Sequence, residues 1–160
     1  MNFKIETVEK INVIKGQYAT AQGCILPALY VLEEHEGQVT PEREKALAHL
    51  LDVPTYQVAE ALSFYTMYNR HGRGKHHFQL CRNISCYLRG SDEVIALFQK
   101  RLGILPGEVS ADGKYELELA ECLGNCDHAP AGILGKEDIN DLNCDKLNAL
   151  LDKLGAPHGV

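Results

Sequence analysis

Two features that mark other classes of protein are missing from this sequence: an excess of basic residues and a long apolar run. The chain has 16 Lys and Arg against 22 Asp and Glu, so its formal net charge is -6. Without a basic stripe to neutralise phosphates, the composition argues against nucleic-acid binding. No run approaches the roughly 20 apolar residues of a membrane span, and the opening MNFKIETVEK lacks the apolar core of a secretion signal. We therefore expect a folded, cytoplasmic protein with no direct membrane insertion.

Two short motifs are also missing. No glycine-rich dinucleotide fingerprint of the Gly-x-Gly-x-x-Gly type occurs, so NAD or flavin binding would have to reside in another chain. No Cys-x-x-Cys pair occurs either. Thiol-disulfide oxidoreductases of the usual kind need that spacing at a helix start, where the dipole lowers the pKa of one thiol. That enzyme class is therefore disfavoured.

Cysteine is present at moderate density, with six in 160 residues. This is well below the density of a small disulfide-stapled scaffold. In a reducing compartment, paired cysteines more often bind metal or carry out redox chemistry than form structural bridges. We therefore set disulfides aside and look for a metal or redox centre.

The first half of the chain, residues 1–73, predicts a small helical bundle. Apolar residues at helical spacing indicate a helix that Gly37 ends, and Thr40 before Pro41 is an N-cap signal for the next. Pro54 opens a third helix. The predicted buried residues are Ile25, Leu29, Leu32, Ala46, Leu47, Leu50, Leu51, Val58, Ala59 and Leu62. The bundle carries no obvious catalytic constellation, so we interpret it as a scaffold and docking surface.

An aromatic patch, Phe64, Tyr65 and Tyr68, ends the helical half. We predict that it packs in the core or between domains, and a docking face for a partner is the alternative.

A polar break with two glycines, residues 71–77, separates the halves of the chain. We place the domain boundary there, with a helical bundle over 1–73 and a second domain over 74–160. The break contains three histidines. Because nothing in a linker fixes their geometry, we predict solvated loop residues rather than metal ligands for His71, His76 and His77.

The second half alternates between strand and helix patterns. Strands are predicted over 78–80 and 114–120, and Ser91 is the predicted cap of a helix that ends at Gly103. A short apolar piece and a last helix, ended by Gly155, complete the chain. The order strand, helix, strand, strand, helix predicts a small sheet with helices layered on it, so the fold class is α+β. The predicted buried helix residues are Val94, Ile95, Leu97, Phe98, Leu102, Leu147, Leu150, Leu151 and Leu154.

Two close cysteine pairs follow the predicted strands. Cys81 and Cys86 form a C-x4-C, and Cys122 and Cys126 form a C-x3-C. Two loops at one end of the sheet could therefore bring four thiolates together. Structural zinc is commonly held by four cysteines in pairs of this spacing. A [2Fe-2S] cluster also takes four thiolates, two on each iron, so spacing alone leaves both open.

The residues around the pairs favour the cluster slightly. An anionic centre with four thiolates needs backbone N–H donors and positive charge around it. Arg82 and Arg89 flank the first pair, Gly90 follows it, and Gly124 lies within the second pair. Small residues let backbone amides approach sulfur. Zinc remains the alternative at this point.

Three further candidates are predicted not to be ligands. His128 follows the second pair as C-x3-C-x-H, which could suggest histidine ligation. With four cysteines available, we expect it to lie beside the centre or in solvent. Cys24 and Cys144 are unpaired in sequence and fall on or beside predicted helices, so we expect both to be small buried apolar groups.

The stretches CRNISCYLRGSD from Cys81 and ECLGNCDHAP from Glu121 resemble the thioredoxin-like [2Fe-2S] ferredoxin family. That family includes the small [2Fe-2S] subunit of NADH:quinone oxidoreductase and related subunits of NAD-linked hydrogenases and formate dehydrogenases. The resemblance extends over roughly residues 22–155, because ILPALYVLEEHEGQVTPE and VAEALSFYTMYN also look like the N-terminal bundle of the family.

The resemblance implies an electron-transfer subunit that transforms no substrate alone. It implies a thioredoxin-like domain after the linker and a partner subunit that binds flavin and NADH, with FMN near the cluster and further iron–sulfur subunits in the complex. By resemblance, the cluster ligands are Cys81, Cys86, Cys122 and Cys126. A zinc-binding interaction protein and a free-standing soluble ferredoxin are the competing hypotheses.

Overall fold

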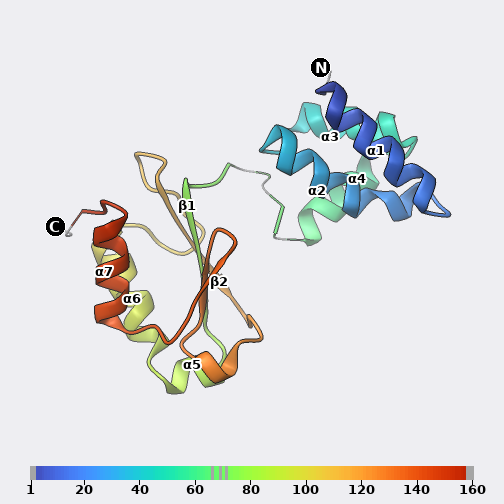
Figure 1. The fold of residues 1–160 in the computed structure, drawn as a ribbon. Helices are drawn as coiled ribbons and strands as arrows, with labels where there is room; N and C mark the ends of the chain where they lie inside the picture. Colours follow the sequence, from blue (N-terminus) through green and yellow to red (C-terminus); the bar gives the residue numbers. More distant parts are fainter. Residues whose placement is uncertain (1–2, 66, 69, 71, 158–160) are drawn as a thin grey trace. The chain divides into compact units, whose positions relative to one another are not determined.

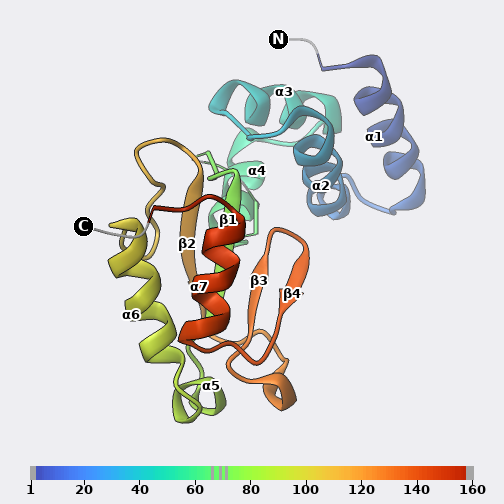
Figure 2. The same cartoon turned by 60° about the vertical axis from the view of Figure 1, so that its left-hand side comes forward.

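The computed structural model describes residues 3–65, 67–68, 70 and 72–157, and Figures 1 and 2 show its fold from two sides. The chain forms two compact units, Met1–Gly72 and Arg73–Val160. The first is helical and the second combines a sheet with helices, which confirms the predicted α+β class. Across these described ranges, no helix is both long enough and apolar enough to cross a membrane.

The described part of the first unit consists of helices. The helix α1 packs against α2, α3 packs against α4, and α2 also contacts α3 and α4. Their apolar faces enclose one core, in which Ile11, Leu29 and Leu47 are fully buried. The elements are α1 (Ile5–Gln17), the 3₁₀ turn η1 (Gln22–Cys24), α2 (Ile25–Glu36), α3 (Pro41–Leu51) and α4 (Thr55–Phe64).

The helix boundaries in this unit follow local chemistry. The side chain of Thr40 accepts a hydrogen bond from the Arg43 N–H at the start of α3, as the cap signal predicted. Gly37 ends α2 with a φ of 76°, a left-handed value that favours glycine. The helix α1 was not predicted, because its residues are mostly polar and only Thr7 and Ile11 are buried.

The aromatic patch at the end of α4 is only partly buried. Tyr68 lies in the core, and its hydroxyl donates to the Leu26 carbonyl at 2.9 Å. Phe64 is 77% exposed and Tyr65 is 38% exposed. The prediction of packing in the core is therefore right for Tyr68, whereas Phe64 does not pack in the core of its unit, and its packing between domains stays a prediction.

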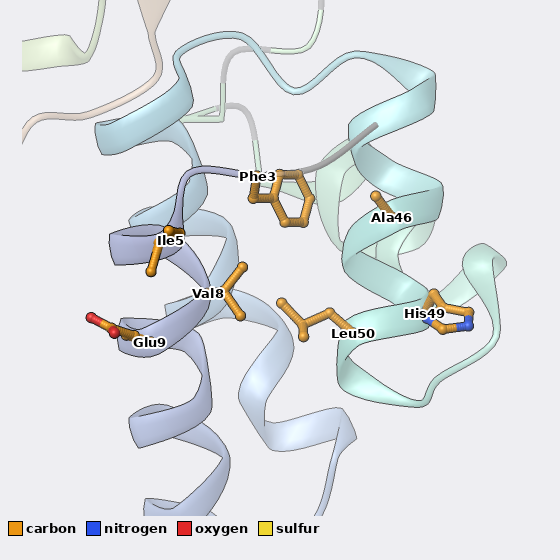
Figure 3. A pocket seen from close by; sticks show the side chains of 7 residues that line it. All are labelled: Phe3, Ile5, Val8, Glu9, Ala46, His49 and Leu50. Carbon is orange, nitrogen blue, oxygen red and sulfur yellow. The ribbon is translucent and has the colours of Figure 1, made fainter.

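An open hollow lies between α1 and α3 in the first unit (Figure 3). Its volume is about 530 Å³. The lining is mostly apolar and contains no cysteine, so the hollow is unrelated to the predicted metal ligands. The residues that line it are Phe3, Ile5, Val8, Glu9, Ala46, His49 and Leu50.

The second unit is built on a four-stranded mixed sheet with the strand order β2-β1-β3-β4. The strands β1 and β2 run parallel, whereas β3 is antiparallel to both β1 and β4. The strands are β1 (His76–Cys81), β2 (Tyr115–Ala120), β3 (Gly132–Leu134) and β4 (Glu137–Ile139). The helical elements are α5 (Ile84–Leu88), α6 (Ser91–Leu102), η2 (Cys126–His128) and α7 (Cys144–Lys153).

One face of this sheet carries the core of the unit. The helices α6 and α7 pack against each other on the same side of the sheet, as Figure 2 shows. Phe78 of β1 is opposite Leu117 of β2, and both are fully buried. The ring of Phe98 on α6 meets that of Phe78 edge-on, with the centroids 4.8 Å apart. This packing fixes the direction of β1 and β2, and therefore where the residues after them begin.

Two histidines of the predicted linker lie in a strand instead. His76 and His77 are the first residues of β1. His77 is buried, and its Nε2 is 2.9 Å from a carboxylate oxygen of Glu118 on β2. The prediction of solvated loop residues is therefore wrong for this pair, because the neighbouring strand supplies the partners that a linker lacks. His71 lies outside the described residues.

The predicted cap of α6 is also wrong. The N-cap position is Gly90, which has a φ of 92°, and Ser91 is the first helical residue. The Ser91 hydroxyl is buried and has no hydrogen-bond partner among the described residues. The helix ends at Gly103, as predicted. The short elements α5 and β4 were not predicted.

Candidate metal centre

All four predicted ligands lie at or just beyond the carboxyl ends of the parallel strands β1 and β2. Cys81 is the last residue of β1, and Cys86 lies on α5. Cys122 follows the end of β2, and Cys126 begins η2. Both views show α5 and η2 side by side at this end of the sheet. All four are free cysteines, so their sulfurs are not held in disulfides.

The short helix α5 positions Cys86 close to Cys81. The side chain of Asn83 accepts a hydrogen bond from the Ile84 N–H at 2.9 Å, which starts the helix directly after the strand. Cys86 on this helix packs against Cys81 at the end of β1. Cys86 is 1% exposed and Cys81 is 3% exposed.

The first pair sits in a small apolar cluster. Cys81 and Cys86 pack with the buried Ala129 and Ala131, and Leu123 of the second cysteine segment covers them in part. The N–H of Cys81 donates to the Ala131 carbonyl at 3.0 Å. Burial of the Cys81 and Cys86 sulfurs therefore depends on residues that precede and follow Cys126 in the sequence.

The two buried thiols have different acidities. Burial is the largest effect at each and disfavours the thiolate. At Cys81, the backbone N–H groups of Asn83 and Leu123 favour the thiolate enough to lower its pKa below the ordinary value. At Cys86, burial outweighs the Ala131 N–H, and the neighbouring Cys81 adds to it, so the pKa is raised. Backbone N–H groups therefore favour the thiolate at both sulfurs.

The second pair is exposed to solvent. Cys122 and Cys126 both lie on the surface. The Gly124 N–H donates to the Cys122 sulfur at 3.3 Å, and Gly124 has a φ of +73°. A negative charge on Cys126 contributes to the raised pKa of Cys86, so these two sulfurs lie within electrostatic reach. The second segment therefore comes close to the first through Leu123 and Cys126.

The sulfurs of Cys81 and Cys86 interact directly, whereas Cys126 acts on Cys86 only through its charge. Within the described residues, no three His, Cys, Asp or Glu side chains are grouped so that they could hold one metal ion. The assignment of four ligands therefore stays a prediction. Two thiolate pairs on adjoining segments, with N–H donors at three of the four sulfurs, have the donor chemistry of a two-iron centre.

Both arginines beside the first pair reach the second segment. The Arg82 guanidinium lies 2.5 Å from a carboxylate oxygen of Glu121, which is next to Cys122. The Arg89 Nε donates to the carbonyl of Ala129 at 2.7 Å, 40 residues further along the chain. The sequence indicated the positive charges but not these partners, because no local signal relates residues so far apart.

The residues predicted not to be ligands behave largely as expected. His128 is half exposed, and its ring nitrogens face Asp127 and Asp141, at 3.7 and 3.4 Å. Cys24 is buried and its thiol approaches the Thr20 carbonyl. Cys144 is only partly buried at the start of α7, so the prediction of burial is too strong there.

A family model and curated relatives match nearly the whole chain. The family model of the thioredoxin-like [2Fe-2S] ferredoxins matches residues 11–155. A subunit of the NADH-quinone oxidoreductase of Rhizobium meliloti is 33% identical over 95% of this chain and 90% of its own length. The NADH-quinone oxidoreductase of Aquifex aeolicus has a subunit that is 32% identical over 94% of each chain.

A solved structure shares the fold. The NAD+-reducing [NiFe]-hydrogenase in its air-oxidized state gives a TM-score of 0.75 with 20% identity, over 85% of this chain. The match spans only 23% of that hydrogenase chain. At this identity the likeness shows the fold alone. Taken with the family match and the relatives above, it shows that the chain belongs to the thioredoxin-like [2Fe-2S] ferredoxin family and that its cofactor is a [2Fe-2S] cluster.

Proposed function

We propose that this chain is the electron-transfer subunit of an NAD(H)-linked oxidoreductase and that Cys81, Cys86, Cys122 and Cys126 hold its cluster. The cluster would exchange single electrons with a flavin in a partner subunit that oxidises NADH. The enzyme would be an NADH:quinone oxidoreductase, an NAD-linked hydrogenase or a formate dehydrogenase. This chain alone would transform no substrate, because the reactions of NAD and flavin would occur in the partner.

One observation carries the proposal. Two cysteine segments meet at the carboxyl ends of β1 and β2, where the Gly124 N–H donates to the Cys122 sulfur and backbone N–H groups favour the thiolates of Cys81 and Cys86. This arrangement lies within the residues that match the family model. The relatives from Rhizobium meliloti and Aquifex aeolicus, which are named as parts of NADH-quinone oxidoreductase, support the choice of enzyme class.

The residues of this chain would bind the cluster and set its surroundings, whereas the redox chemistry belongs to the cluster itself. When bound, a [2Fe-2S] cluster accepts and releases one electron at a time. The N–H groups of Asn83, Leu123 and Ala131 stabilise negative charge on the buried sulfurs. Ala129 and Ala131 pack with the two buried cysteines and exclude water from their sulfurs. Together they provide the local positive potential and low polarity on which the reduction potential depends.

The surface around the cysteines supports docking of a partner at this end. Ile84 is 64% exposed, Tyr87 is 54% exposed and Leu88 is 75% exposed, all on α5. Adjacent exposed apolar side chains on so short a helix are unusual for a surface that faces only water. They lie on the element that carries Cys86, so a protein bound there would be close to the cluster. We propose that the flavin subunit docks on this surface and that the helical unit gives further docking area.

The decisive experiment is anaerobic purification of the full chain followed by metal and sulfide analysis. We expect two irons and two acid-labile sulfides per chain, a reddish-brown colour and an electron paramagnetic resonance signal after reduction. One zinc, no sulfide and a colourless protein would instead support the zinc-binding interaction protein and overturn the proposal.

The partner is tested by purifying the native assembly under mild conditions. We expect a flavin- and NADH-binding subunit and further iron–sulfur subunits to accompany this chain. NADH should then reduce the cluster in the assembly but not in the isolated chain. Reduction of the isolated chain by NADH would contradict the proposed division between the subunits.

A further inference from the structure

Two arginines beside the first cysteine pair make unequal links to the second cysteine segment. Arg82 directly follows Cys81, and Arg89 follows the last residue of α5. Each reaches residues around the second pair, Glu121 for Arg82 and Ala129 for Arg89. The two links differ in the charge of the acceptor and in its exposure, so the arginines should have different effects on the centre.

The link made by Arg82 is an exposed ion pair. The Arg82 side chain is 52% exposed and that of Glu121 is 77% exposed. Exposed pairs contribute little to stability, because solvent screens the charges and two long side chains must be ordered. The carboxylate also cancels most of the field of the guanidinium beyond the pair. Arg82 should therefore neither hold the two segments together nor favour negative charge on the centre.

The link made by Arg89 joins fixed parts of the backbone. Its own N–H donates to the Cys86 carbonyl at 3.2 Å, which places Arg89 relative to that cysteine. Its side-chain acceptor, the Ala129 carbonyl, belongs to a fully buried residue whose N–H donates to the Cys126 carbonyl at 3.4 Å. The guanidinium thus connects the helix of Cys86 to the turn of Cys126.

The charge of Arg89 is not balanced by this link. Arg89 is exposed like Arg82, but its acceptor is a neutral carbonyl, and within the described residues Arg89 forms no ion pair. The guanidinium of arginine carries a permanent positive charge in proteins. An uncompensated cation beside a centre that gains one negative charge on reduction favours the reduced state.

We infer that Arg89 is a positioning residue of the centre, which clamps the Cys86 helix to the backbone after Cys126 and raises the reduction potential by its unpaired charge. The inference rests on the proposed function, because it assumes that these cysteines hold the cluster. It assigns one effect to the hydrogen bond with Ala129 and another to the charge of the guanidinium. Separate experiments can test the two effects.

The charge is tested by redox titration of the full chain with its cluster. Arg89→Gln should lower the potential, so that the ratio of reduced to oxidised cluster at a fixed potential falls on the order of tenfold, or about 59 mV for one electron. Arg89→Lys keeps the charge and should stay close to the wild-type potential. The double variant Arg82→Gln/Glu121→Gln removes both charges of the exposed pair, so it is the matched control and should also stay close. An unchanged potential in Arg89→Gln, or an equal shift in Arg89→Lys, would overturn the charge assignment.

The clamp is tested in the cluster-free protein, so this arm does not depend on cluster assembly. Loss of the hydrogen bond to Ala129 should let α5 open more often, and the buried Cys86 should then react with iodoacetamide at least fivefold faster in Arg89→Gln than in Arg82→Gln. Peptide mass spectrometry gives the rate at Cys86 alone. Equal rates in the two variants would overturn the clamp.

The two failures can be told apart. A wild-type chain purified without iron and sulfide would contradict the proposed function, whereas the Cys86 alkylation rates would still report on the clamp. If the cluster is normal and its reduction potential is unchanged in Arg89→Gln, the proposed function stands and this inference is overturned.

Discussion

The two cysteine pairs lie in opposite environments although they are adjacent in the fold. Cys81 and Cys86 are almost fully buried, at the end of a central strand and on a helix. Cys122 and Cys126 are exposed, on a loop and at the start of a 3₁₀ turn. One half of the candidate site is therefore buried in a small apolar cluster, whereas the other half lies on the surface.

This difference separates the pair whose position the fold determines from the pair whose position the cofactor must determine. The first pair is placed by strand register, the Asn83 cap and packing against Ala129 and Ala131. The second pair lies on a loop and a 3₁₀ turn, which are placed by the Gly124 N–H to Cys122, by Leu123 against the first pair and by the Ala129 N–H to the Cys126 carbonyl. We expect the first pair to be held in position without the cluster, and the second to become ordered when the cluster binds. Substitutions and reactivity measurements at the two pairs can test that contrast.

The largest effect should come from replacing any one of the four cysteines with serine. Serine is a poorer ligand than a thiolate, so we expect loss or strong alteration of the cluster at Cys81, Cys86, Cys122 and Cys126. Iron and sulfide analysis and electron paramagnetic resonance of the reduced protein measure this. Cys24→Ala and Cys144→Ala are the controls and should keep the wild-type signal. An unchanged signal in Cys122→Ser would contradict the assignment of the exposed pair.

The next effect is a difference in thiol reactivity in the cluster-free protein. Cys122 and Cys126 should be alkylated at rates on the order of those of free cysteine, whereas Cys81 and Cys86 should be protected at least tenfold, because buried groups react only after local opening. Mass spectrometry of quenched samples gives each rate. The buried Cys24 is the internal standard for protection. Similar rates at all four sites would show that the first pair is not preformed.

The sequence predicted the long elements of the fold well. Period-two apolar residues indicated β2, and helical spacing with Gly103 indicated α6, because the apolar side chains on one face of each element pack against the core. The short elements α5 and β4 contain too few residues to show a period. The histidines of β1 were mistaken for a linker because the partner of His77, Glu118, is on another strand.

The candidate site was predicted in composition but not in environment. The cysteine spacing indicated four sulfurs after two strands, and the structure places all four at that end of the sheet. The contrast between the pairs could not be predicted, because burial of Cys86 depends on Ala129 and Ala131, more than forty residues away. The hydrogen bond from Arg89 to the Ala129 carbonyl could not be predicted from the sequence for the same reason.

A third effect concerns the stability of the cluster-free protein. Cys86→Ser places a hydroxyl in an apolar cluster with few partners, which should cost roughly 1–3 kcal/mol in the free energy of unfolding. Cys122→Ser exchanges one exposed polar group for another and should change that free energy by at most about 0.5 kcal/mol. Urea denaturation followed by circular dichroism measures both. A loss in Cys122→Ser as large as that in Cys86→Ser would mean that the second loop is also preformed.

The smallest effect should come from Gly124→Ala in the second loop. Gly124 has a φ of +73°, and an added Cβ would meet no atom within 4 Å, so any penalty comes from the backbone alone. If the loop is held in this conformation, alanine costs about 1–2 kcal/mol. A loop that becomes ordered only around the cluster can avoid that cost by moving.

The contrast between the pairs therefore predicts that Gly124→Ala unfolds in urea with nearly the wild-type free energy when the cluster is absent. It should cost the full penalty only when the cluster is present, which would appear as faster iron release to a chelator. Gly103→Ala, at the end of α6 with a φ of +65° and equally open space, is the matched control. It should lower the stability in both states, because the end of α6 does not depend on the cluster. If Gly124→Ala also destabilises the cluster-free protein by the full amount, the exposed pair is as firmly placed as the buried one, and solvent exposure is then the sole difference between them.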